Sequence, residues 1–395
     1  MDSSLEGDVM DALLMFLAAL STLWWVGFAS LPWGSWRNRE ILDPIDGGDD
    51  EESLDEITVV VPARNEAEVI QPALQSIIAQ GPGLKIILID DRSEDATVAK
   101  ARALAHANLY IVDGAPLPAG WSGKLWALEQ GRQQVTTRYT LFLDADIKLT
   151  RGNVTALKNK MRHEAIPFIS LTAVPAMSST WEKLLMPAFV YFFKALYPFH
   201  RVNLAASKCA AAAGGCILVE TRVLDQIGGF GSIKSAVIDD CALARRVKSQ
   251  GFKIWLGLTH SLESIRGYRD LKEIGDMIAR CAFAQLHYSL GFLILSTFGL
   301  LLIYALPAFM VASSIDLIRY LSLGSLAIMF LTYVPTLRFY DRSWAWALCL
   351  PLIAVFFLAM TWTSAIRYWR GELTRWKGRV YAREGVVALS EIQSK

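Results

Sequence analysis

Short apolar runs rich in β-branched residues recur through the first half of the chain, and polar loops follow them. The runs ITVVV, KIILI and YTLFL are each bounded by polar residues, which is typical of strands buried on both faces of a sheet. Amphipathic stretches lie between them. In QPALQSIIAQ, for example, Leu74, Ile77 and Ile78 fall on one helical face. This alternation predicts an α/β domain over residues 57–280.

Acidic residues gather at four points of this region, the acidic stations. They are Glu66 in VVVPARNE, Asp90 and Asp91 in IILIDDRS, Asp144 and Asp146 in YTLFLDADI, and Asp239 and Asp240 in VIDDCALARRV. The first three follow predicted strands, and open α/β sheets bind ligands beyond the carboxyl ends of their strands. The pattern therefore predicts one acidic cleft. Adjacent carboxylates repel one another unless a cation or a proton transfer makes use of them, and a metal-bound diphosphate would account for the whole set.

The first two stations also have purely structural interpretations. Glu66 could be a first-turn acid that interacts favourably with a helix dipole. Of Asp90 and Asp91, one could cap the next helix while the other accepts hydrogen bonds from a base or a ribose. Taken alone, neither station separates a structural role from ligand binding.

The third and fourth stations indicate chemistry more strongly. Asp144 and Asp146 are separated by one small residue at a strand end, and such a pair offers the hard oxygen ligands that Mg²⁺ or Mn²⁺ prefers. Loop capping is the structural alternative. Asp239 and Asp240 begin a predicted helix, where both are not needed as caps. One of them is free to act as a general base.

Apolar residues are concentrated at the two ends of the chain. Residues 12–33 carry no charge and are long enough to cross a bilayer. The charged residues before this segment are all acidic, and Arg37 and Arg39 follow it. The positive-inside rule therefore places the N-terminus outside and the α/β domain in the cytosol. A cleaved signal peptide is the alternative, but its basic start and small-residue cleavage site are absent. We expect an anchor over residues 1–36 and a mobile acidic linker over residues 37–56.

The C-terminal region, residues 281–370, predicts two or three further membrane spans. Its apolar stretches lie near residues 289–312, 317–333 and 344–366. The basic tail, residues 371–395, has the charge of a cytosolic segment. An N-out anchor followed by three spans would put this tail outside. One stretch could therefore be re-entrant or lie in the membrane interface.

Residues 181–204, WEKLLMPAFVYFFKALYPFHRVNL, are aromatic-rich and carry interspersed basic side chains. Such a segment suits the membrane interface, and an ordinary core helix is the alternative. The whole chain has 395 residues, 53% of them hydrophobic, and a net charge of +1. This balance gives no indication of nucleic-acid binding. Its five cysteines show no CxxC pair, so we expect no disulfide partner and a reducing compartment.

Together these motifs resemble the family 2 glycosyltransferases. The order VVVPARNE, DDRS, GWSGKLWALEQG, DAD, GGCILVETRVLDQIGGF and DDCALARRVKSQG carries the resemblance over residues 57–280. It implies the GT-A nucleotide-diphospho-sugar transferase fold, a Rossmann-like mixed sheet. The flanking spans, with LPWGSWRNREIL and RCAFAQLHYS, look closest to the hopene-associated glycosyltransferases of bacterial hopanoid biosynthesis. Ceramide glucosyltransferases and carotenoid glycosyltransferases look more distant.

The resemblance implies a set of donor-binding residues. Pro62, Arg64 and Glu66 would border the nucleoside. Asp91 would hydrogen-bond the uracil or equivalent base. Lys124, in GKLWAL, would approach the phosphates or the ribose, with an exposed loop lysine as the structural alternative.

The resemblance also implies a metal site and a close backbone approach. Asp144 and Asp146 would hold Mg²⁺ or Mn²⁺ and the ribose, with Asp146 as the direct ligand of the metal. Gly214 and Gly215 would let the backbone come close to the donor sugar or the acceptor.

Asp240 would be the catalytic base, with Asp239 where the family more often has glutamate. One departure from the family concerns the QxxRW motif of processive members, which is incomplete here and argues against a polysaccharide synthase. Arg280 could neutralise leaving-group charge in its place. The other candidates for this role are Gln285, His287 and Tyr288.

The expected function is an inverting, metal-dependent transfer of a sugar from a nucleotide-diphosphate donor to a membrane lipid acceptor. The expected location is the bacterial inner membrane, crossed several times, with the catalytic domain on the cytosolic face. A polyprenyl-phosphate sugar synthase is the first alternative. A nucleotidyltransferase would need a glycine-rich basic loop after Val61, which is absent. An inactive membrane scaffold would not need all four acidic stations.

Overall fold

The computed structural model describes residues 3–45, 53–376, 379–382 and 385–388. Their contacts divide the chain into two compact units. The helical unit comprises Met1–Asn38, Met177–Pro198 and Arg269–Trp369. The sheet unit comprises Arg39–Ala176, Phe199–Tyr268 and Arg370–Lys395. Of the predicted linker, residues 46–52 lie outside the described residues, as do residues 389–395 of the predicted tail.

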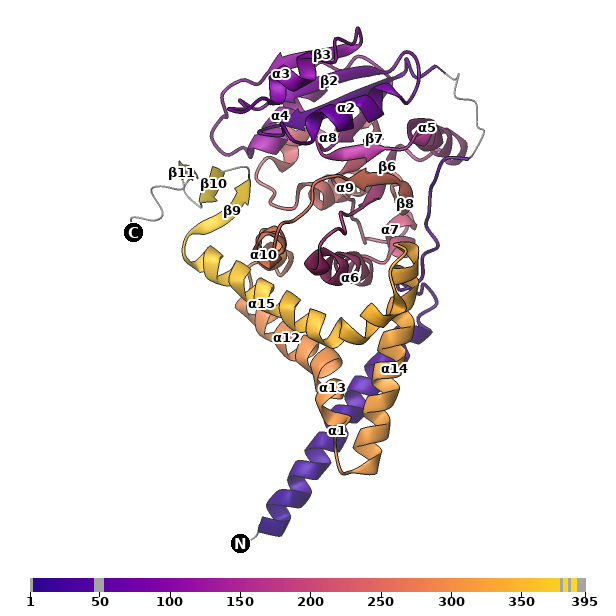
Figure 1. The fold of residues 1–395 in the computed structure, drawn as a ribbon, viewed down its shortest axis with the longest axis vertical. Coiled ribbons are helices and arrows are strands. Elements are labelled where there is room, and N and C mark those ends of the chain that lie inside the picture. Colours follow the sequence, from indigo (N-terminus) through magenta and orange to yellow (C-terminus); the bar gives the residue numbers. More distant parts are fainter. Residues whose placement is uncertain (1–2, 46–52, 377–378, 383–384, 389–395) are drawn as a thin grey trace. The chain divides into compact units, whose positions relative to one another are not determined.

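A mixed eight-stranded sheet forms the centre of the sheet unit, in the order β3-β2-β1-β4-β7-β6-β8-β5 (Figure 1). Its strands are β1 (Ile57–Ala63), β2 (Lys85–Asp90), β3 (Leu109–Asp113), β4 (Tyr139–Leu143), β5 (Ile147–Leu149), β6 (Phe168–Val174), β7 (Cys216–Glu220) and β8 (Trp255–Ser264). The first four strands are parallel to one another. The carboxyl ends of β1, β2 and β4 therefore share one edge, and the first three acidic stations follow these ends, as the sequence predicts.

Antiparallel pairing on the other side of β4 gives the sheet its mixed character. β7 pairs antiparallel with both β4 and β6, β6 runs parallel to β8, and β5 pairs antiparallel with β8. This arrangement brings segments more than a hundred residues apart to the end of β4. It matches the predicted fold class.

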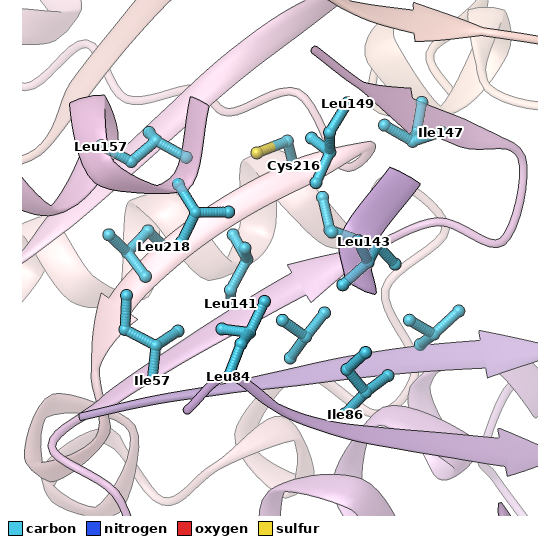
Figure 2. Close-up of a cluster of buried hydrophobic side chains, with 14 of the residues drawn as sticks. Ile57, Leu84, Ile86, Leu141, Leu143, Ile147, Leu149, Leu157, Cys216 and Leu218 are labelled. Atoms are coloured by element: carbon cyan, nitrogen blue, oxygen red, sulfur yellow. The ribbon is translucent and has the colours of Figure 1, made fainter. Parts of the chain in front are cut away.

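The helices of the sheet unit are α2 (Ile70–Ile78), α3 (Thr97–Arg102), α4 (Gly123–Arg132), α5 (Asn153–Glu164), α7 (Phe199–Asn203), α8 (Thr221–Ile227), the 3₁₀ turn η1 (Phe230–Ile233) and α9 (Asp239–Ser249). They cover both faces of the sheet. Figure 2 shows the larger core on one face, where Ile57, Ile86 and Leu141 meet Leu157 of α5. Cys216 packs there as an apolar side chain.

The opposite face of the sheet carries α4, because alternate strand residues point that way. Ile87 and Ile89 of β2 pack against Ala127 of α4. A Cβ atom on Gly131 would lie 2.3 Å from Val60 Cγ1 of β1. Glycine at this position therefore lets α4 lie close to the sheet, which places the N-terminal end of the helix beside the end of β4.

The helical unit contains four helical segments long and apolar enough to cross a membrane: Glu6–Ser30, Leu290–Met310, Asp316–Phe339 and Trp344–Trp369. One N-terminal and three C-terminal candidates agree with the upper end of the predicted number. Its elements are α1 (Ser3–Ser30), α6 (Thr180–Leu196), α10 (Leu271–Ala279), α11 (Ala282–Gln285), α12 (Leu290–Leu300), the π-helical turn η2 (Leu301–Ala305), α13 (Leu306–Met310), α14 (Asp316–Phe339), the 3₁₀ turn η3 (Trp344–Cys349) and α15 (Leu350–Trp369).

Polar side chains join these apolar helices to one another. Thr22 Oγ1 of α1 lies 3.0 Å from both the Leu321 carbonyl oxygen and Ser325 Oγ of α14. Trp25 Nε1 donates to the Ile303 carbonyl at 2.9 Å. The hydrophobic effect does not drive apolar helices together in lipid, so such hydrogen bonds and close packing stabilise their association there.

The segment predicted at the membrane interface, residues 181–204, is helical over Thr180–Leu196 as α6. A capping box between Ser179 and Glu182 begins this helix. Tyr191 Oη lies 3.1 Å from Thr332 Oγ1 of α14 within the helical unit. Placement at the interface stays a prediction.

The predicted tail contains the antiparallel strands β9 (Glu372–Trp376), β10 (Arg379–Ala382) and β11 (Gly385–Ala388). The side of the membrane on which it lies stays a prediction, as do the predicted domain boundaries.

Candidate active site

The turn between β4 and β5 carries the third acidic station. The Asp144 N–H donates to the Gly215 carbonyl of the neighbouring segment at 3.2 Å, and Ile147 N–H donates to the Asp144 carbonyl at 3.1 Å. Asp146 Oδ2 accepts a hydrogen bond from Ser264 Oγ at 3.0 Å. The side chains of Asp144 and Asp146 are 32% and 21% exposed, so both carboxylates are partly open to a ligand.

Lys124 lies among the carboxylates. Ser122 caps α4 by accepting a hydrogen bond from the Leu125 N–H, which fixes the first turn that carries Lys124. The Lys124 Nζ atom lies 2.7 Å from Asp144 Oδ1 and 3.8 Å from Asp239 Oδ2. Burial alone would lower the pKa of this ammonium group, but the two carboxylates outweigh burial and raise the pKa. Lys124 is thus the cation that lets these acids share one space, and its predicted role towards phosphates or ribose stays a prediction.

The fourth station forms the first two residues of α9, whose N-cap residue is Ile238. Asp240 Oδ2 accepts from the Gly214 N–H at 2.8 Å, and Oδ1 accepts from the Cys241 N–H at 2.7 Å. Burial, and then the neighbouring charge of Asp239, raise the pKa of Asp240 to about 6. A carboxylate with such a pKa accepts protons more readily than an ordinary aspartate and is still ionised near neutral pH.

Gly214 makes this arrangement possible. A Cβ atom at this position would lie 3.2 Å from Asp240 Oδ2 and 3.5 Å from Lys124 Nζ. The backbone N–H can therefore reach the carboxylate only where no side chain intervenes. A Cβ atom on Gly215 would instead meet Ile147 Cδ1 at 3.2 Å.

One cavity joins the third and fourth stations. Its polar lining consists of Lys124, Asp144, Gly214, Asp239 and Asp240. Its apolar lining consists of Leu128, Phe142, Leu143, Ile217, Phe230 and Leu243. Charged groups beside an apolar floor interact more strongly than in water, because little solvent screens them.

Glu129 and Arg132 position Phe230, which lines the cavity, and the sequence prediction included neither of them. Glu129 Oε2 accepts from the Phe230 N–H at 3.0 Å and from Arg132 Nε at 3.0 Å. Arg132 Nη1 also donates to Asp225 Oδ1 at 2.6 Å. This network fixes the loop that carries Phe230. The only sequence signal was a Glu–Arg pair three residues apart in WALEQGR.

The first two stations meet at the ends of β1 and β2. Arg64 Nη1 donates to the carbonyl oxygen of Asp91 at 2.7 Å. The Glu66 N–H donates to Thr97 Oγ1 at 2.7 Å. Glu66 and Asp91 are both buried. Pro62 is a buried residue of β1 paired with Ile89 of β2.

Arg266 connects the first and third stations, and the sequence prediction did not include it. Its guanidinium group forms an ion pair with Glu66, and Nε lies 3.8 Å from Asp146 Oδ2. Local sequence gives little sign of this role, because Arg266 follows β8 and reaches Asp146 only through the pairing of β5 with β8.

The remaining predicted residues belong to the helical unit. Arg280 is the C-cap of α10. Gln285 Nε2 donates to Tyr197 Oη at 2.6 Å. His287 and Tyr288 both have positive φ angles, 53° and 54°, which residues other than glycine rarely adopt. Their roles towards a donor or acceptor stay predictions.

The chemistry of Asp144 and Asp146 fits one kind of metal site. Among the residues that the structure describes, no three histidine, cysteine or acidic side chains converge as a metal-binding group. Mg²⁺ and Mn²⁺ do not need such a cage, since one or two carboxylates, substrate phosphates and water complete their shell. Two partly open carboxylates at one strand end suit a divalent ion that arrives with a diphosphate.

Comparison with known proteins gives the class of this domain. Residues 58–228 match the family model Glycosyl transferase family 2, so the chain contains a glycosyltransferase family 2 domain. The mannosyltransferase PcManGT from Pyrobaculum calidifontis, solved in complex with GDP-Man and Mn²⁺, has a similar fold. Its TM-score is 0.55 at 17% identity, and the alignment covers 89% of this chain and 99% of that one. The likeness supports the mixed α/β sheet of the GT-A type.

Two curated relatives share higher identity over shorter segments. The 4,4'-diaponeurosporenoate glycosyltransferase of Staphylococcus aureus (strain MRSA252) is 36% identical over 105 residues, 26% of this chain and 28% of the relative. The protein of the same name from Staphylococcus haemolyticus (strain JCSC1435) is 32% identical over 112 residues, 28% of this chain and 30% of the relative. The matched segment thus spans less than a third of either relative.

We predict that Lys124→Met destabilises the protein in a pH-dependent way. Without the ammonium group, ionised Asp144, Asp239 and Asp240 repel one another, and removal of one partner from a buried ion pair costs roughly 3 kcal/mol. Because Asp144 and Asp240 have raised pKa values, they take up protons as the pH falls and the repulsion decreases. The loss relative to wild type should be larger at pH 8 than at pH 5.

Thermal unfolding of the purified full chain at both pH values measures this difference. Lys148→Met is the matched control, because Lys148 is exposed on the neighbouring β5. An equal loss at both pH values would show that Lys124 acts through packing instead of charge.

Proposed function

We propose that the protein is an inverting glycosyltransferase that moves a sugar from a nucleotide-diphosphate donor to a membrane lipid acceptor. The cavity of Lys124, Asp144, Asp239 and Asp240 in a family 2 domain carries this proposal. It combines partly open carboxylates suited to a metal-bound diphosphate with a buried carboxylate suited to proton abstraction. One site thus offers both groups that direct displacement at an anomeric carbon requires.

Donor binding is assigned to the ends of β1, β2 and β4. Arg64, Glu66 and Asp91 border the nucleoside, with Pro62 shaping the turn before them. Support comes from the Arg64–Asp91 hydrogen bond, which joins the two strand ends at one edge of the sheet. Asp146 and Asp144 would hold Mg²⁺ or Mn²⁺, which would supply electrostatic stabilisation for the departing diphosphate.

Asp240 is assigned as the general base. Its carboxylate takes the proton of the acceptor hydroxyl while that oxygen bonds to the anomeric carbon. The bond from this carbon to the diphosphate oxygen breaks in the same displacement, and the configuration inverts. The Gly214 and Cys241 N–H groups hold the carboxylate in place. Burial raises the pKa of Asp240, and the negative charge of Asp239 raises it further.

A lipid acceptor is supported by the four apolar helical segments and by relatives named for transfer to the lipid-like 4,4'-diaponeurosporenoate. We place the protein in the bacterial inner membrane with its catalytic domain in the cytosol; the charges flanking the first apolar segment support the cytosolic side. The hopene-associated resemblance makes a hopanoid the first acceptor to test. A polyprenyl phosphate is the second, because the same donor site could serve a phosphate acceptor.

Incubation of the purified protein with native lipid extract, labelled sugar nucleotides and Mg²⁺ or Mn²⁺ tests the proposal. We expect a glycosylated lipid, which mass spectrometry would identify together with the released nucleoside diphosphate. Parallel reactions with polycyclic lipid alcohols and with polyprenyl phosphate separate the two acceptor classes. Release of pyrophosphate would instead indicate a nucleotidyltransferase.

We predict that Asp240→Asn abolishes transfer while donor binding stays near wild type. The amide cannot take the acceptor proton, and loss of a general base lowers the rate at least about 100-fold. Transfer rates and the Kd of the nucleoside diphosphate measure the two effects separately. Asp113→Asn, a change at an exposed aspartate of β3, is the control. Turnover above about a tenth of the wild-type rate would remove Asp240 from the role of base.

The pH dependence of the wild-type rate should follow the ionisation of Asp240. The base works only when deprotonated, so the transfer rate should rise with pH through about 6, the pKa of Asp240, and then level off. Saturating donor and acceptor keep binding effects out of the profile. A rate that continues unchanged down to pH 4.5 would contradict the assignment.

A further inference from the structure

The segment after β8 is attached to Asp146 by the register of the sheet. β5 and β8 pair antiparallel, with Ile147 opposite Ser264. The Ile265 N–H then donates to the Asp146 carbonyl at 2.9 Å. Ser264 Oγ donates to the Asp146 carboxylate at 3.0 Å. Two hydrogen bonds thus hold Ser264 and Ile265 against Asp146, the proposed metal ligand. Arg266 follows Ile265 in the chain.

Arg266 bridges two carboxylates that the proposed function assigns to the donor. It forms an ion pair with Glu66, whose side chain is 9% exposed, and Nε lies 3.8 Å from Asp146 Oδ2. The Arg266 side chain itself is 38% exposed. The Glu66 end of the bridge is therefore buried, while part of the Arg266 side chain is exposed to solvent.

The charge balance of this bridge changes when a donor binds. Glu66 and Asp146 repel one another unless a cation lies between them, and Arg266 provides that cation. A divalent ion at Asp146 brings two positive charges to the carboxylate and repels the guanidinium group. The diphosphate that accompanies the ion offers oxygens that match the planar fork of arginine.

We propose that Arg266 is a donor-binding residue that exchanges Asp146 for the donor diphosphate when the divalent ion binds. In the donor-free protein it compensates the charges of Glu66 and Asp146. In the donor complex the ion takes over Asp146, and Arg266 donates hydrogen bonds to the diphosphate. This inference rests on the proposed function, because it requires a nucleotide-diphosphate donor at this edge of the sheet.

Calorimetric titration of the purified full chain with defined probes tests the exchange. The probes are UDP and GDP in the presence of Mn²⁺, the nucleosides uridine and guanosine, and Mn²⁺ alone. The variants are Arg266→Gln, which removes the charge, and Arg266→Lys, which keeps the charge but lacks the planar fork. Arg222→Gln is the matched control, because Arg222 belongs to the same unit and is 73% exposed.

Arg266→Gln should weaken the binding of nucleoside diphosphate and tighten the binding of Mn²⁺ alone. Nucleoside diphosphate binding should weaken at least about tenfold, since a hydrogen bond to a charged group is lost, while nucleoside binding stays within about twofold. Mn²⁺ alone should bind more tightly, because no guanidinium group competes for Asp146. The affinities of Arg266→Lys for nucleoside diphosphate and for Mn²⁺ alone should lie between those of the wild type and Arg266→Gln. If Arg266→Gln does not fold, Arg266→Lys still tests the inference, because it keeps a cation beside Glu66.

A purely structural role of Arg266 gives a different result. Equal weakening of diphosphate and nucleoside binding would overturn the inference, as would Mn²⁺ binding that does not tighten in Arg266→Gln. If the wild type binds a nucleoside diphosphate and Arg266→Gln binds it equally well, only the role of Arg266 fails. If the wild type binds neither UDP nor GDP with Mn²⁺, the donor site of the proposed function fails with it.

Discussion

The candidate site depends on the attraction between the Lys124 ammonium group and the carboxylates around it, those of Asp144 and Asp239. Three aspartates, from the turn after β4 and from α9, line one cavity with an apolar floor, where ionised carboxylates lose hydration and repel one another. Lys124 lies within 4 Å of the Asp144 and Asp239 carboxylates. Ser122 and the close approach of α4 to β1 fix its position. The Lys124 ammonium group, positioned by the Ser122 helix cap and the Gly131 contact, therefore allows the carboxylates of the third and fourth acidic stations to lie around one cavity.

The mixed sheet explains why residues so distant in sequence meet there. The insertion of β7 beside β4 brings Gly214 and Gly215 next to the turn that carries Asp144. The antiparallel pairing of β5 with β8 brings Arg266 to Asp146. The parallel half of the sheet supplies the strand ends that carry Glu66 and Asp91. Backbone pairing thus determines which side chains meet, and the chemistry of the site follows from the order of the strands.

Local patterns predicted the strands and the carboxylates because both leave signals within a few residues. The apolar runs before Glu66, Asp91 and Asp144 are indeed β1, β2 and β4. Arg266 and Glu129 were missed for a physical reason. Their partners lie about a hundred residues or more away, at Asp146 and at the Phe230 N–H, and periodicity holds no information about such pairs. The cations that the chain itself places beside the acids were only partly foreseen: Lys124 was among the predicted residues, whereas Arg266, 3.8 Å from Asp146, was not.

The chain passes repeatedly between its two units. The first 38 residues, α6 and the segment from Arg269 to Trp369 belong to the helical unit, and the parts between them belong to the sheet unit. The eight-stranded sheet therefore cannot be completed before α6 has been synthesised, and the helical unit is completed only after all eight strands. During synthesis β1 to β6 emerge before α6, and β7 and β8 emerge after it. Packing of the apolar helices and closure of the sheet thus become steps of one assembly process, and a fragment limited to residues 58–228 would carry α6 without the other helices of its unit.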